Sequence, residues 1–331
     1  MKRIAVLGAG SWGTALALVL ARNGHEICLW GRSEDTMAIM RENRVNARYL
    51  PDQVLPPAIT PMADLTAAVK NADVVLIAVP SATFAELCQT LATTLVTPVP
   101  IVWATKGLAA NGHGLLHEVA QAALPGAPLA VLSGPSFAAE VAAGLPTAIV
   151  LASHDAKTAN QLTALFHDER FRVYTSNDMV GVQLGGAVKN VLAIATGIAD
   201  GLGFGANARA GLITRGLAEV RRLGAHLGAQ DATLTGLAGM GDLILTCTDD
   251  QSRNRRFGIA LGRGESANDA AEQIGQVVEG AFTAAEVAEM AHRLAVEMPI
   301  CQQVHAVLSQ RVAPHTAAQL LMDRAPRAEF N

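Results

Sequence analysis

The chain has 331 residues, of which 50% are hydrophobic and 16% are charged, and its formal net charge is -4. This composition excludes an intrinsically disordered chain, and a mildly acidic chain without a long basic tract argues against nucleic acid as the main partner. The length favours two domains over one.

The N-terminus and the cysteines indicate a cytoplasmic protein. The apolar run at residues 4–7 is too short for the hydrophobic region of a signal peptide, and no run approaches the roughly 18 apolar residues of a membrane span. Cys28, Cys88, Cys247 and Cys301 are scattered without a C-x-x-C pair, which is typical of a reducing compartment. We therefore expect no disulfide framework, no zinc ribbon and no membrane span.

The first half of the chain alternates short apolar runs with helical or loop segments. The runs predicted as strands are residues 4–7, 27–30, 74–79, 101–104, 129–132, 148–151 and 171–174. Continuous apolar runs are typical of strands buried on both faces, so we predict a doubly wound parallel sheet.

Helical patterns dominate from residue 177 onward. They cover residues 180–198, 208–227, 253–261, 283–294 and 300–308. We therefore predict an α/β N-terminal domain over residues 1–178 and an all-α C-terminal domain over residues 179–331.

The first predicted strand runs into a glycine-rich turn. Gly8, Gly10 and Gly13 form a G-x-G-x-x-G pattern that follows a strand, opens a helix and precedes a second strand. Such glycines allow a tight turn, close approach of the backbone to a pyrophosphate and close packing of helix on strand. The N–H groups of the helix start then face the phosphates. The pattern predicts a dinucleotide site; a glycine-rich turn without a ligand is the alternative.

The end of the second strand bears on the choice between NADP and NAD. An acidic residue about 20 positions beyond the glycines would bind the ribose 2′-hydroxyl of NAD. The strand instead ends at Gly31, Arg32 and Ser33. Because an arginine can pair with a 2′-phosphate, we predict NADP as the preferred cofactor. Glu34 and Asp35 could still serve NAD, and Arg32 could be an ordinary exposed arginine.

Two later strands end in polar residues at the sheet edge where ligands bind in open α/β folds. Lys106 and Gly107 follow one strand, and Gly134 and Ser136 follow the next. Lys106 supplies a positive charge, and Ser136 with nearby N–H groups supplies hydrogen bonds. The alternative makes Lys106 a solvated loop lysine.

Lys189 is the only charged residue between Asp178 and Asp200 in an otherwise apolar predicted helix. A buried ammonium needs a partner, and burial lowers its pKa; snorkelling to the surface is the alternative. Asp242, in the glycine-rich turn AGMGDL, is the candidate partner, and Asp200 is its rival. A lysine whose pKa is lowered by burial can serve as a general base near neutral pH.

A phosphate site is predicted where the helix over residues 253–261 begins. Ser252 is the expected N-cap, and the first turn holds Arg253, Asn254, Arg255 and Arg256. Arginines there oppose the helix dipole, and a bound phosphate would remove the conflict. Neutralisation by Asp249 and Asp250 is the alternative.

The histidines predict no metal site. His113 and His117 have i, i+4 spacing, but we interpret them as surface residues.

Several long motifs carry a family resemblance. GAGSWGTA, SGPSFAAEV, GGAVKNVLAIATG, GLAGMGDLILTCT, SRNRRFG and VVEGAFTA occur in order between residue 4 and about residue 310. In these motifs the chain resembles the bacterial NAD(P)-dependent glycerol-3-phosphate dehydrogenases. The resemblance implies a Rossmann-like N-terminal domain and reversible reduction of dihydroxyacetone phosphate to sn-glycerol 3-phosphate, which supplies phospholipid synthesis.

The resemblance also implies residue roles, with Lys189 as the proton donor and acceptor. The substrate would be surrounded by Lys106, Gly134, Ser136, Lys189, Asp242, Ser252, Arg253 and Asn254. Beyond Gly8, Gly10 and Gly13, the cofactor would contact Ser11, Trp12, Arg32, Lys106, Ala138, Arg253, Val277 and Glu279.

Two other functions stay open. A 3-hydroxyacid or 6-phosphogluconate type of dehydrogenase can also use a lysine, but would need a carboxylate-binding site. A non-catalytic dinucleotide sensor would need the glycine loop but not Lys189, Asp242 and Arg253 together. In each case we expect a small-molecule ligand, and we expect a homodimer; residues 311–331 carry no motif.

Overall fold

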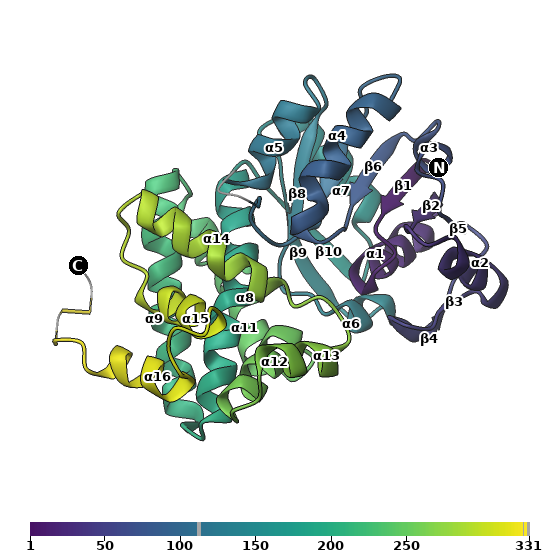
Figure 1. Cartoon of the computed structure of the whole chain (residues 1–331). Coiled ribbons are helices and arrows are strands. Elements are labelled where there is room, and N and C mark those ends of the chain that lie inside the picture. Colours follow the sequence, from purple (N-terminus) through teal and green to yellow (C-terminus); the bar gives the residue numbers. More distant parts are fainter. Residues whose placement is uncertain (111–113, 327, 330–331) are drawn as a thin grey trace.

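The computed structural model describes residues 1–110, 114–326 and 328–329. Figure 1 shows two parts side by side: a sheet flanked by helices, which contains the N-terminus, and a group of helices that leads to the C-terminus. Among the described residues β10 (Phe171–Ser176) is the last strand, and the long helix α8 (Met179–Gly201) follows it. The predicted domain boundary at residue 178 stays a prediction.

The described residues form an eight-stranded sheet in the order β10-β9-β8-β7-β6-β1-β2-β5. β1 lies between β2 and β6, so that Val6 is opposite Leu29 on one side and Leu76 on the other. β5 was not predicted, because its sequence ITPM is short and contains a proline. The strands other than β10 are β1 (Arg3–Leu7), β2 (Glu26–Trp30), β5 (Ile59–Met62), β6 (Val74–Ile77), β7 (Ile101–Trp103), β8 (Leu129–Ser133) and β9 (Thr147–Ala152).

The prediction of an entirely parallel sheet is wrong at one pair of strands. β8 and β9 are antiparallel, with Leu132 opposite Leu151, whereas β9 and β10 are parallel to each other. The connection between β8 and β9 contains only the short helix α6 (Ala138–Ala142). At about 1.5 Å per residue that helix is too short to run back along a strand that rises about 3.3 Å per residue. The chain therefore turns at the carboxyl edge of the sheet.

Helices cover both faces of the sheet, because successive strand residues point to opposite faces. In β1, Ile4 and Val6 belong to one core cluster, which includes residues of α1 (Ser11–Arg22), α2 (Glu34–Asn43) and α7 (Ala156–Phe166). Ala5 and Leu7 belong to the opposite cluster, which includes residues of α3 (Leu65–Val69), α4 (Phe84–Thr94) and α5 (Leu116–Ala123). The doubly wound arrangement is confirmed.

α8 is the central helix of the second part. Its residues are buried without interruption from Gly181 to Ala199. Although no membrane span was expected, α8 alone among the described helices has the length and hydropathy of one; its apolar window is wholly buried in the fold, as in the core helix of a soluble protein. The other helices of this part are α9 (Gly205–Leu227), α10 (Asp231–Leu234), α11 (Asp242–Thr248), α12 (Arg253–Gly262), α13 (Ala267–Ile274), α14 (Glu279–Arg293), α15 (Pro299–Leu308) and α16 (Pro314–Met322).

Glycines bring α8 and α12 together backbone against backbone. A Cβ atom on Gly258 would lie 2.2 Å from the carbonyl oxygen of Ile194, and one on Gly197 would lie 2.2 Å from that of Arg255. These approaches leave no room for a side chain. The position of α12, and of the arginine-rich turn at its start, therefore depends on glycine at both helices.

A small hairpin that the sequence analysis did not predict links the two parts. β3 (Val45–Asn46) and β4 (Leu50–Val54) pair antiparallel. In the turn between them Arg48 donates a hydrogen bond to the carbonyl of Gly275, at 3.2 Å. The hairpin thus reaches the loop between α13 and α14.

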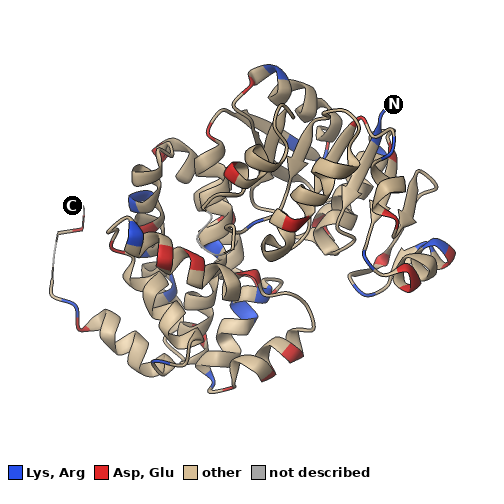
Figure 2. Cartoon of the chain, turned by 45° about the horizontal axis from the view of Figure 1, so that its top comes forward, with Lys and Arg blue, Asp and Glu red and all other residues tan. Residues whose placement is uncertain are grey.

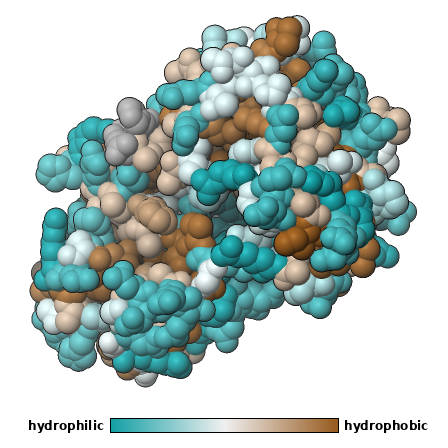
Figure 3. All heavy atoms as spheres, turned by 45° about the vertical axis from the view of Figure 1, so that its right-hand side comes forward, coloured by the Kyte–Doolittle hydropathy of each residue, from teal (hydrophilic) through white to brown (hydrophobic). Residues whose placement is uncertain are grey.

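The molecular surface is mixed in charge and hollowed. In Figure 2 basic and acidic residues are scattered along the elements of both parts. Figure 3 shows a hollow near the middle of the molecule, bordered by both hydrophilic and hydrophobic residues.

The contact between α8 and α12 predicts a stability effect. Gly258→Ala should lower the free energy of unfolding by about 1–3 kcal/mol, because the added methyl group forces the helices apart. Gly211→Ala is the matched control: a Cβ there meets nothing within 4 Å in helix α9, and replacing a helical glycine by alanine should stabilise by about 0.5–1 kcal/mol. Urea denaturation measures both. Equal urea midpoints for the two variants would show that the close approach of α8 and α12 does not determine the stability of the fold.

Candidate active site

The glycine-rich turn between β1 and α1 has the geometry of a phosphate-binding loop. Gly8 has a φ of +122°, and a Cβ on it would lie 2.6 Å from the carbonyl oxygen of Ala78; one on Gly13 would lie 1.9 Å from the oxygen of Gly8. Gly10, the N-cap of α1, is different, because a Cβ there meets nothing within 4 Å. Two glycines therefore allow tight packing, and the third leaves the helix start open to a ligand.

Trp12 supplies a second sign that a ligand belongs here. Its indole Nε1 is buried and has no hydrogen-bond partner, although buried indole N–H groups usually have one. The Lys106 ammonium lies 5.8 Å from the centre of its ring. Ser11 begins α1 beside it. The residues present thus fit the pyrophosphate and the adjoining polar groups of a dinucleotide.

Arg32 lies beyond the end of β2, exposed and without a recorded ion pair or hydrogen bond among the described residues. Ser33 caps α2 by accepting from the Thr36 N–H at 3.2 Å. Glu34 pairs with Arg41 on the same helix. Among the described residues, neither Arg32 at the strand end nor Asp35 in the first turn of α2 has an ion pair, whereas Glu34 is engaged.

A cluster of three charges lies at the junction of the two parts. The Lys189 ammonium donates to Asp242 Oδ1 at 2.7 Å, and the Lys106 ammonium donates to Asp242 Oδ2, also at 2.7 Å. Asp242 is completely buried and Lys189 is 7% exposed. Lys106 also donates to the carbonyl of Gly134 at 2.8 Å. The predicted pairing of Lys189 with Asp242 is confirmed, and the snorkelling alternative is wrong.

The rival partner, Asp200, is engaged elsewhere. It accepts from Arg255 at 2.6 Å and from Arg209 at 3.3 Å. It therefore neutralises basic residues of α12 and α9 rather than Lys189.

The environment of Lys189 changes its acid–base behaviour. Burial lowers the pKa of Lys189 to about 8, an effect that the Asp242 carboxylate opposes and the Lys106 ammonium reinforces. The ammonium and the neutral amine are therefore both accessible near neutral pH.

Close packing beside α8 brings Asp242 to Lys189. The π-helical turn η2 (Leu237–Gly241) precedes Asp242, and a Cβ on Gly239 would lie 2.0 Å from the Leu234 oxygen. A Cβ on Gly185 of α8 would lie 2.5 Å from the Ala238 oxygen. The glycines of the AGMGDL turn thus let the backbone approach α8 one turn before Lys189.

Two polar residues of the cluster were missed by the sequence analysis. Thr246 accepts from Lys189 at 2.8 Å and donates to the main-chain oxygen of Asp242 at 2.6 Å. Its spacing of four residues from Asp242 could have placed both on one helix face. Asn190 donates to the main-chain oxygen of Lys106 at 3.2 Å. Its partner is 84 residues away in the chain, so nothing local could have indicated the contact.

The arginines at the start of α12 have different partners. Ser252 is the N-cap, as predicted, and accepts from the Arg255 N–H at 3.1 Å. The Arg255 guanidinium pairs with Asp200 and Asp250, so neutralisation explains this arginine. Arg253 has only a 3.4 Å contact to Gln276 recorded among its described neighbours. Burial lowers the pKa of Arg253, and the nearby Glu279 carboxylate opposes this effect.

The Asn254 side chain makes two of the four hydrogen bonds that its amide group can form. Its Nδ2 donates to Asn190 Oδ1 at 2.9 Å, and its Oδ1 accepts from the Gly280 N–H at 2.9 Å. It therefore ties α12 to α8 and to the start of α14.

Of the other predicted site residues, Ser136 and Glu279 have polar contacts in or beside the cluster, whereas Ala138 and Val277 do not. Ser136 donates to the Gly134 oxygen at 2.9 Å and lies 3.5 Å from the Lys106 ammonium. Glu279 accepts from Ser81. Ala138 is the first residue of α6, and Val277 is exposed in the loop before α14; neither has a recorded polar contact with the cluster.

His117 is not the surface residue that was expected. Its Nδ1 lies 3.0 Å from Gln183 Nε2, its ring is 6.0 Å from that of His154, and burial lowers its pKa. It is partly buried because α5 packs beside the start of α8. His113 lies outside the described residues. Within the described ranges, no group of three or more histidine, cysteine or acidic residues could hold a metal ion.

Comparisons with known proteins agree with this geometry. Two family models match: the N-terminus of NAD-dependent glycerol-3-phosphate dehydrogenase over residues 3–159, and its C-terminus over residues 178–319.

Similar full-length relatives extend the match. Glycerol-3-phosphate dehydrogenase [NAD(P)+] of Halorhodospira halophila is 58% identical over 99% of this chain and 98% of its own, and that of Alkalilimnicola ehrlichii is 58% identical over 97% of each. The crystal structure of glycerol-3-phosphate dehydrogenase from Coxiella burnetii is 50% identical, covers 98% of this chain and 99% of its own, and superposes with a TM-score of 0.95. The chain belongs to the NAD-dependent glycerol-3-phosphate dehydrogenase family.

Proposed function

We propose that this protein reduces dihydroxyacetone phosphate reversibly to sn-glycerol 3-phosphate with NAD(P)H, and that the product supplies phospholipid synthesis. The observation that carries the proposal is the buried Lys189 ammonium, 2.7 Å from Asp242, in the same site as an open glycine loop. Family membership agrees with it. The decisive assay is loss of NADPH absorbance on addition of dihydroxyacetone phosphate. A 3-hydroxyacid dehydrogenase or a dinucleotide sensor would give no loss with this ketone.

The three-charge cluster accounts for the proton transfer. In reduction, the Lys189 ammonium donates its proton to the carbonyl oxygen of the substrate as negative charge develops there. Lys106 stays positive beside it, and Asp242 orients both ammonium groups. In oxidation, neutral Lys189 accepts the hydroxyl proton. When bound, the nicotinamide supplies or accepts the hydride.

The substrate phosphate is proposed to lie at the start of α12. Asp200 and Asp250 neutralise Arg255 but neither Arg253 nor Arg256, and of these two Arg253 is partly buried whereas Arg256 is exposed. The free N–H groups of the helix start also favour an anion. The proposed substrate residues are Lys106, Gly134, Ser136, Lys189, Asp242, Ser252, Arg253 and Asn254. Ser252 and Asn254 also have structural roles at the start of α12. The Ser252 hydroxyl caps the helix, and the Asn254 amide bonds to Asn190 and to the Gly280 N–H.

The cofactor is proposed to bind along the carboxyl edge of the sheet from the glycine loop. The residues proposed for it are Gly8, Gly10, Ser11, Trp12, Gly13, Arg32, Lys106, Ala138, Arg253, Val277 and Glu279. We propose NADP as the preferred form, because Arg32 directly follows the end of β2 and has no ion pair among the described residues, whereas Glu34 is paired and Asp35 lies further along, in the first turn of α2.

A cytoplasmic location and a homodimer complete the proposal. The four cysteines are all buried free thiols, which fits a reducing compartment.

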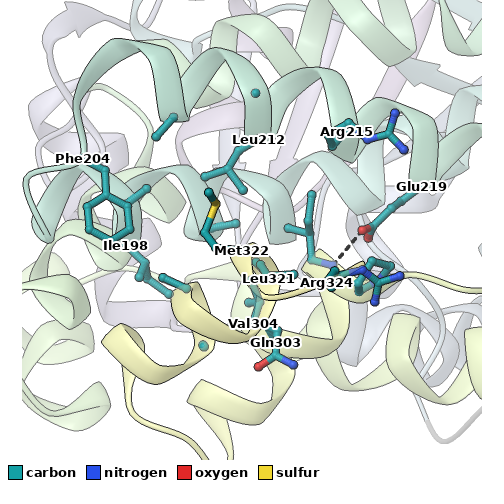
Figure 4. A pocket seen from close by; sticks show the side chains of 18 of the residues that line it. Ile198, Phe204, Leu212, Arg215, Glu219, Gln303, Val304, Leu321, Met322 and Arg324 are labelled. Carbon is teal, nitrogen blue, oxygen red and sulfur yellow. Dashed lines mark hydrogen bonds between the residues drawn. The ribbon is translucent and has the colours of Figure 1, made fainter. Parts of the chain in front are cut away.

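For the dimer, the support is a cavity of about 580 Å³ between α9, α15 and α16, away from the lysine cluster. Figure 4 shows Phe204, Leu212 and Met322 around it, and Phe204 and Met322 are exposed. An apolar face of this kind is typical of a protein interface, and sedimentation velocity measures association directly.

Lys189→Ala should reduce turnover by roughly 10²–10⁴-fold, the loss expected for a general acid–base group. NADPH affinity should stay close to that of the wild type. In the wild type, oxidation should rise with pH through about 8 as Lys189 loses its proton, and reduction should fall over the same range. Lys70→Ala, at an exposed position, is the control. Turnover above about a tenth of the wild-type value in Lys189→Ala would refute the mechanism.

Arg253→Ala should raise the KM for dihydroxyacetone phosphate roughly 10–100-fold, since a charge-assisted contact of about 1.5–3 kcal/mol is lost. Unphosphorylated dihydroxyacetone should be affected far less. Arg256→Ala, an exposed arginine in the same helical turn, is the matched control. If the ratio of kcat/KM for the two ketones is unchanged in Arg253→Ala, Arg253 does not bind the phosphate.

Arg32→Ala should raise the KM for NADPH by about tenfold or more, because the pair with the 2′-phosphate is lost. The KM for NADH, which has no 2′-phosphate, should change little. Steady-state kinetics with both cofactors measure the selectivity. Equal losses for the two would assign Arg32 no part in recognising the phosphate.

A further inference from the structure

A buried carboxylate bridges the two parts of the molecule beside the lysine cluster. Glu279, the first residue of α14, accepts from the Ser81 hydroxyl at 2.8 Å and from the Ser81 N–H at 3.3 Å. Ser81 is buried and begins the short turn η1 (Ser81–Thr83), which follows β6 at the carboxyl edge of the sheet. The same serine therefore binds both carboxylate oxygens.

This bridge touches the segment that carries Lys106. A Cβ on Gly107 would lie 2.5 Å from the Ser81 hydroxyl oxygen and 3.3 Å from Glu279 Oε2. Only a residue without a side chain fits there unless Ser81 shifts. Movement of Ser81 or Glu279 would therefore change the contacts of Gly107, the residue next to Lys106.

A chain of hydrogen bonds returns from Glu279 to Lys106 by another route. The N–H of Gly280 donates to Asn254, Asn254 donates to Asn190, and Asn190 donates to the main-chain oxygen of Lys106. Ser81 and Glu279 thus close a ring of contacts around the site. The main chain next to Glu279 is thus connected to Lys106 through Asn254 and Asn190, and its carboxylate through Ser81 beside Gly107.

Among the described residues, the Glu279 carboxylate accepts hydrogen bonds from Ser81 alone. Burial raises its pKa, whereas the two Ser81 bonds and the Arg253 guanidinium from α12 lower it. Tyr49 of the β3–β4 hairpin lies near the same arginine. The Lys106 ammonium is directed to Asp242 and Gly134 instead.

We propose that Ser81 is a positioning residue that holds the Glu279 carboxylate ready to accept a hydrogen bond from the bound dinucleotide. The proposal rests on the proposed cofactor role of Glu279. A carboxylate offers about four lone-pair sites, and Ser81 fills two of them. The remaining sites suit a donor such as a ribose hydroxyl or the carboxamide N–H of the nicotinamide. Ser81 itself need not touch the cofactor.

The test is the dissociation constant of NADH, which lacks the 2′-phosphate that itself titrates near about pH 6. Binding is followed by the fluorescence of NADH from about pH 5 to about pH 8, the range above the ordinary Glu pKa. Ser81→Ala should weaken binding about three- to tenfold, the range of one hydrogen bond. Because the lost bond had favoured the charged carboxylate, the pH below which affinity declines should also move upward. Glu279→Gln should remove this acidic decline altogether.

Two comparisons separate positioning from a general structural effect. Ser81→Ala should weaken NADH binding no further in a Glu279→Gln background, because both changes act through one carboxylate. Thr83→Val is the matched control: its hydroxyl bonds the Pro80 oxygen within the same turn and does not contact Glu279. It should leave the pH dependence unchanged.

Three results would overturn the proposal: an unchanged pH dependence in Ser81→Ala, additive losses in the double variant, or an acidic decline that persists in Glu279→Gln. The last result needs no Ser81 variant, so the proposal stays testable if Ser81→Ala does not fold. Wild-type protein that fails to bind NADPH would instead contradict the proposed function. Binding of NADPH without reduction of dihydroxyacetone phosphate would contradict the activity alone.

Discussion

The burial of one carboxylate between two ammonium groups is the constraint on which the site depends. Asp242 is completely buried, and it can neutralise only one of Lys189 and Lys106. Taking three charges out of water costs several kcal/mol per ion unless every polar atom is paired. Thr246 and the Gly134 carbonyl meet part of that need. The positive charge that remains favours an anionic ligand at this position.

The same constraint joins the packing of the fold to its chemistry. Lys106 comes from the sheet, whereas Lys189 and Asp242 come from the helical part, so the cluster forms only when the two parts are in contact. Within the helical part, Gly185 and Gly239 let the turn that carries Asp242 approach the backbone of α8, which brings Asp242 to Lys189. A substitution at these glycines would therefore disturb proton transfer as well as stability, although neither residue has a polar side chain.

Sequence reasoning succeeded where local physics decides the outcome. Continuous apolar runs predicted every strand of the described eight-stranded sheet except β5, and a lone charge in an apolar helix predicted that Lys189 needs Asp242. It could not predict the sharing of Asp242 with Lys106, which is 136 residues away, or the bridge between Ser81 and Glu279, which are 198 residues apart. Both depend on how separate elements meet. The run of β9 was predicted as a strand, but its antiparallel direction was not, because an apolar run gives no information about strand direction.

The division of the arginines at the start of α12 shows how burial assigns roles to similar residues. Three arginines in this turn oppose the helix dipole. Two carboxylates neutralise Arg255, Arg256 is exposed to solvent, and Arg253 is partly buried and not neutralised by either carboxylate. Lys106, Lys189 and Arg253 then face Asp242 and Glu279, an excess of one positive charge before substrate binds. A phosphate dianion near this group would raise the pKa of Lys189, because an opposite charge favours the ammonium. Binding of a phosphorylated ketone would therefore increase the fraction of Lys189 that holds the proton needed for its reduction.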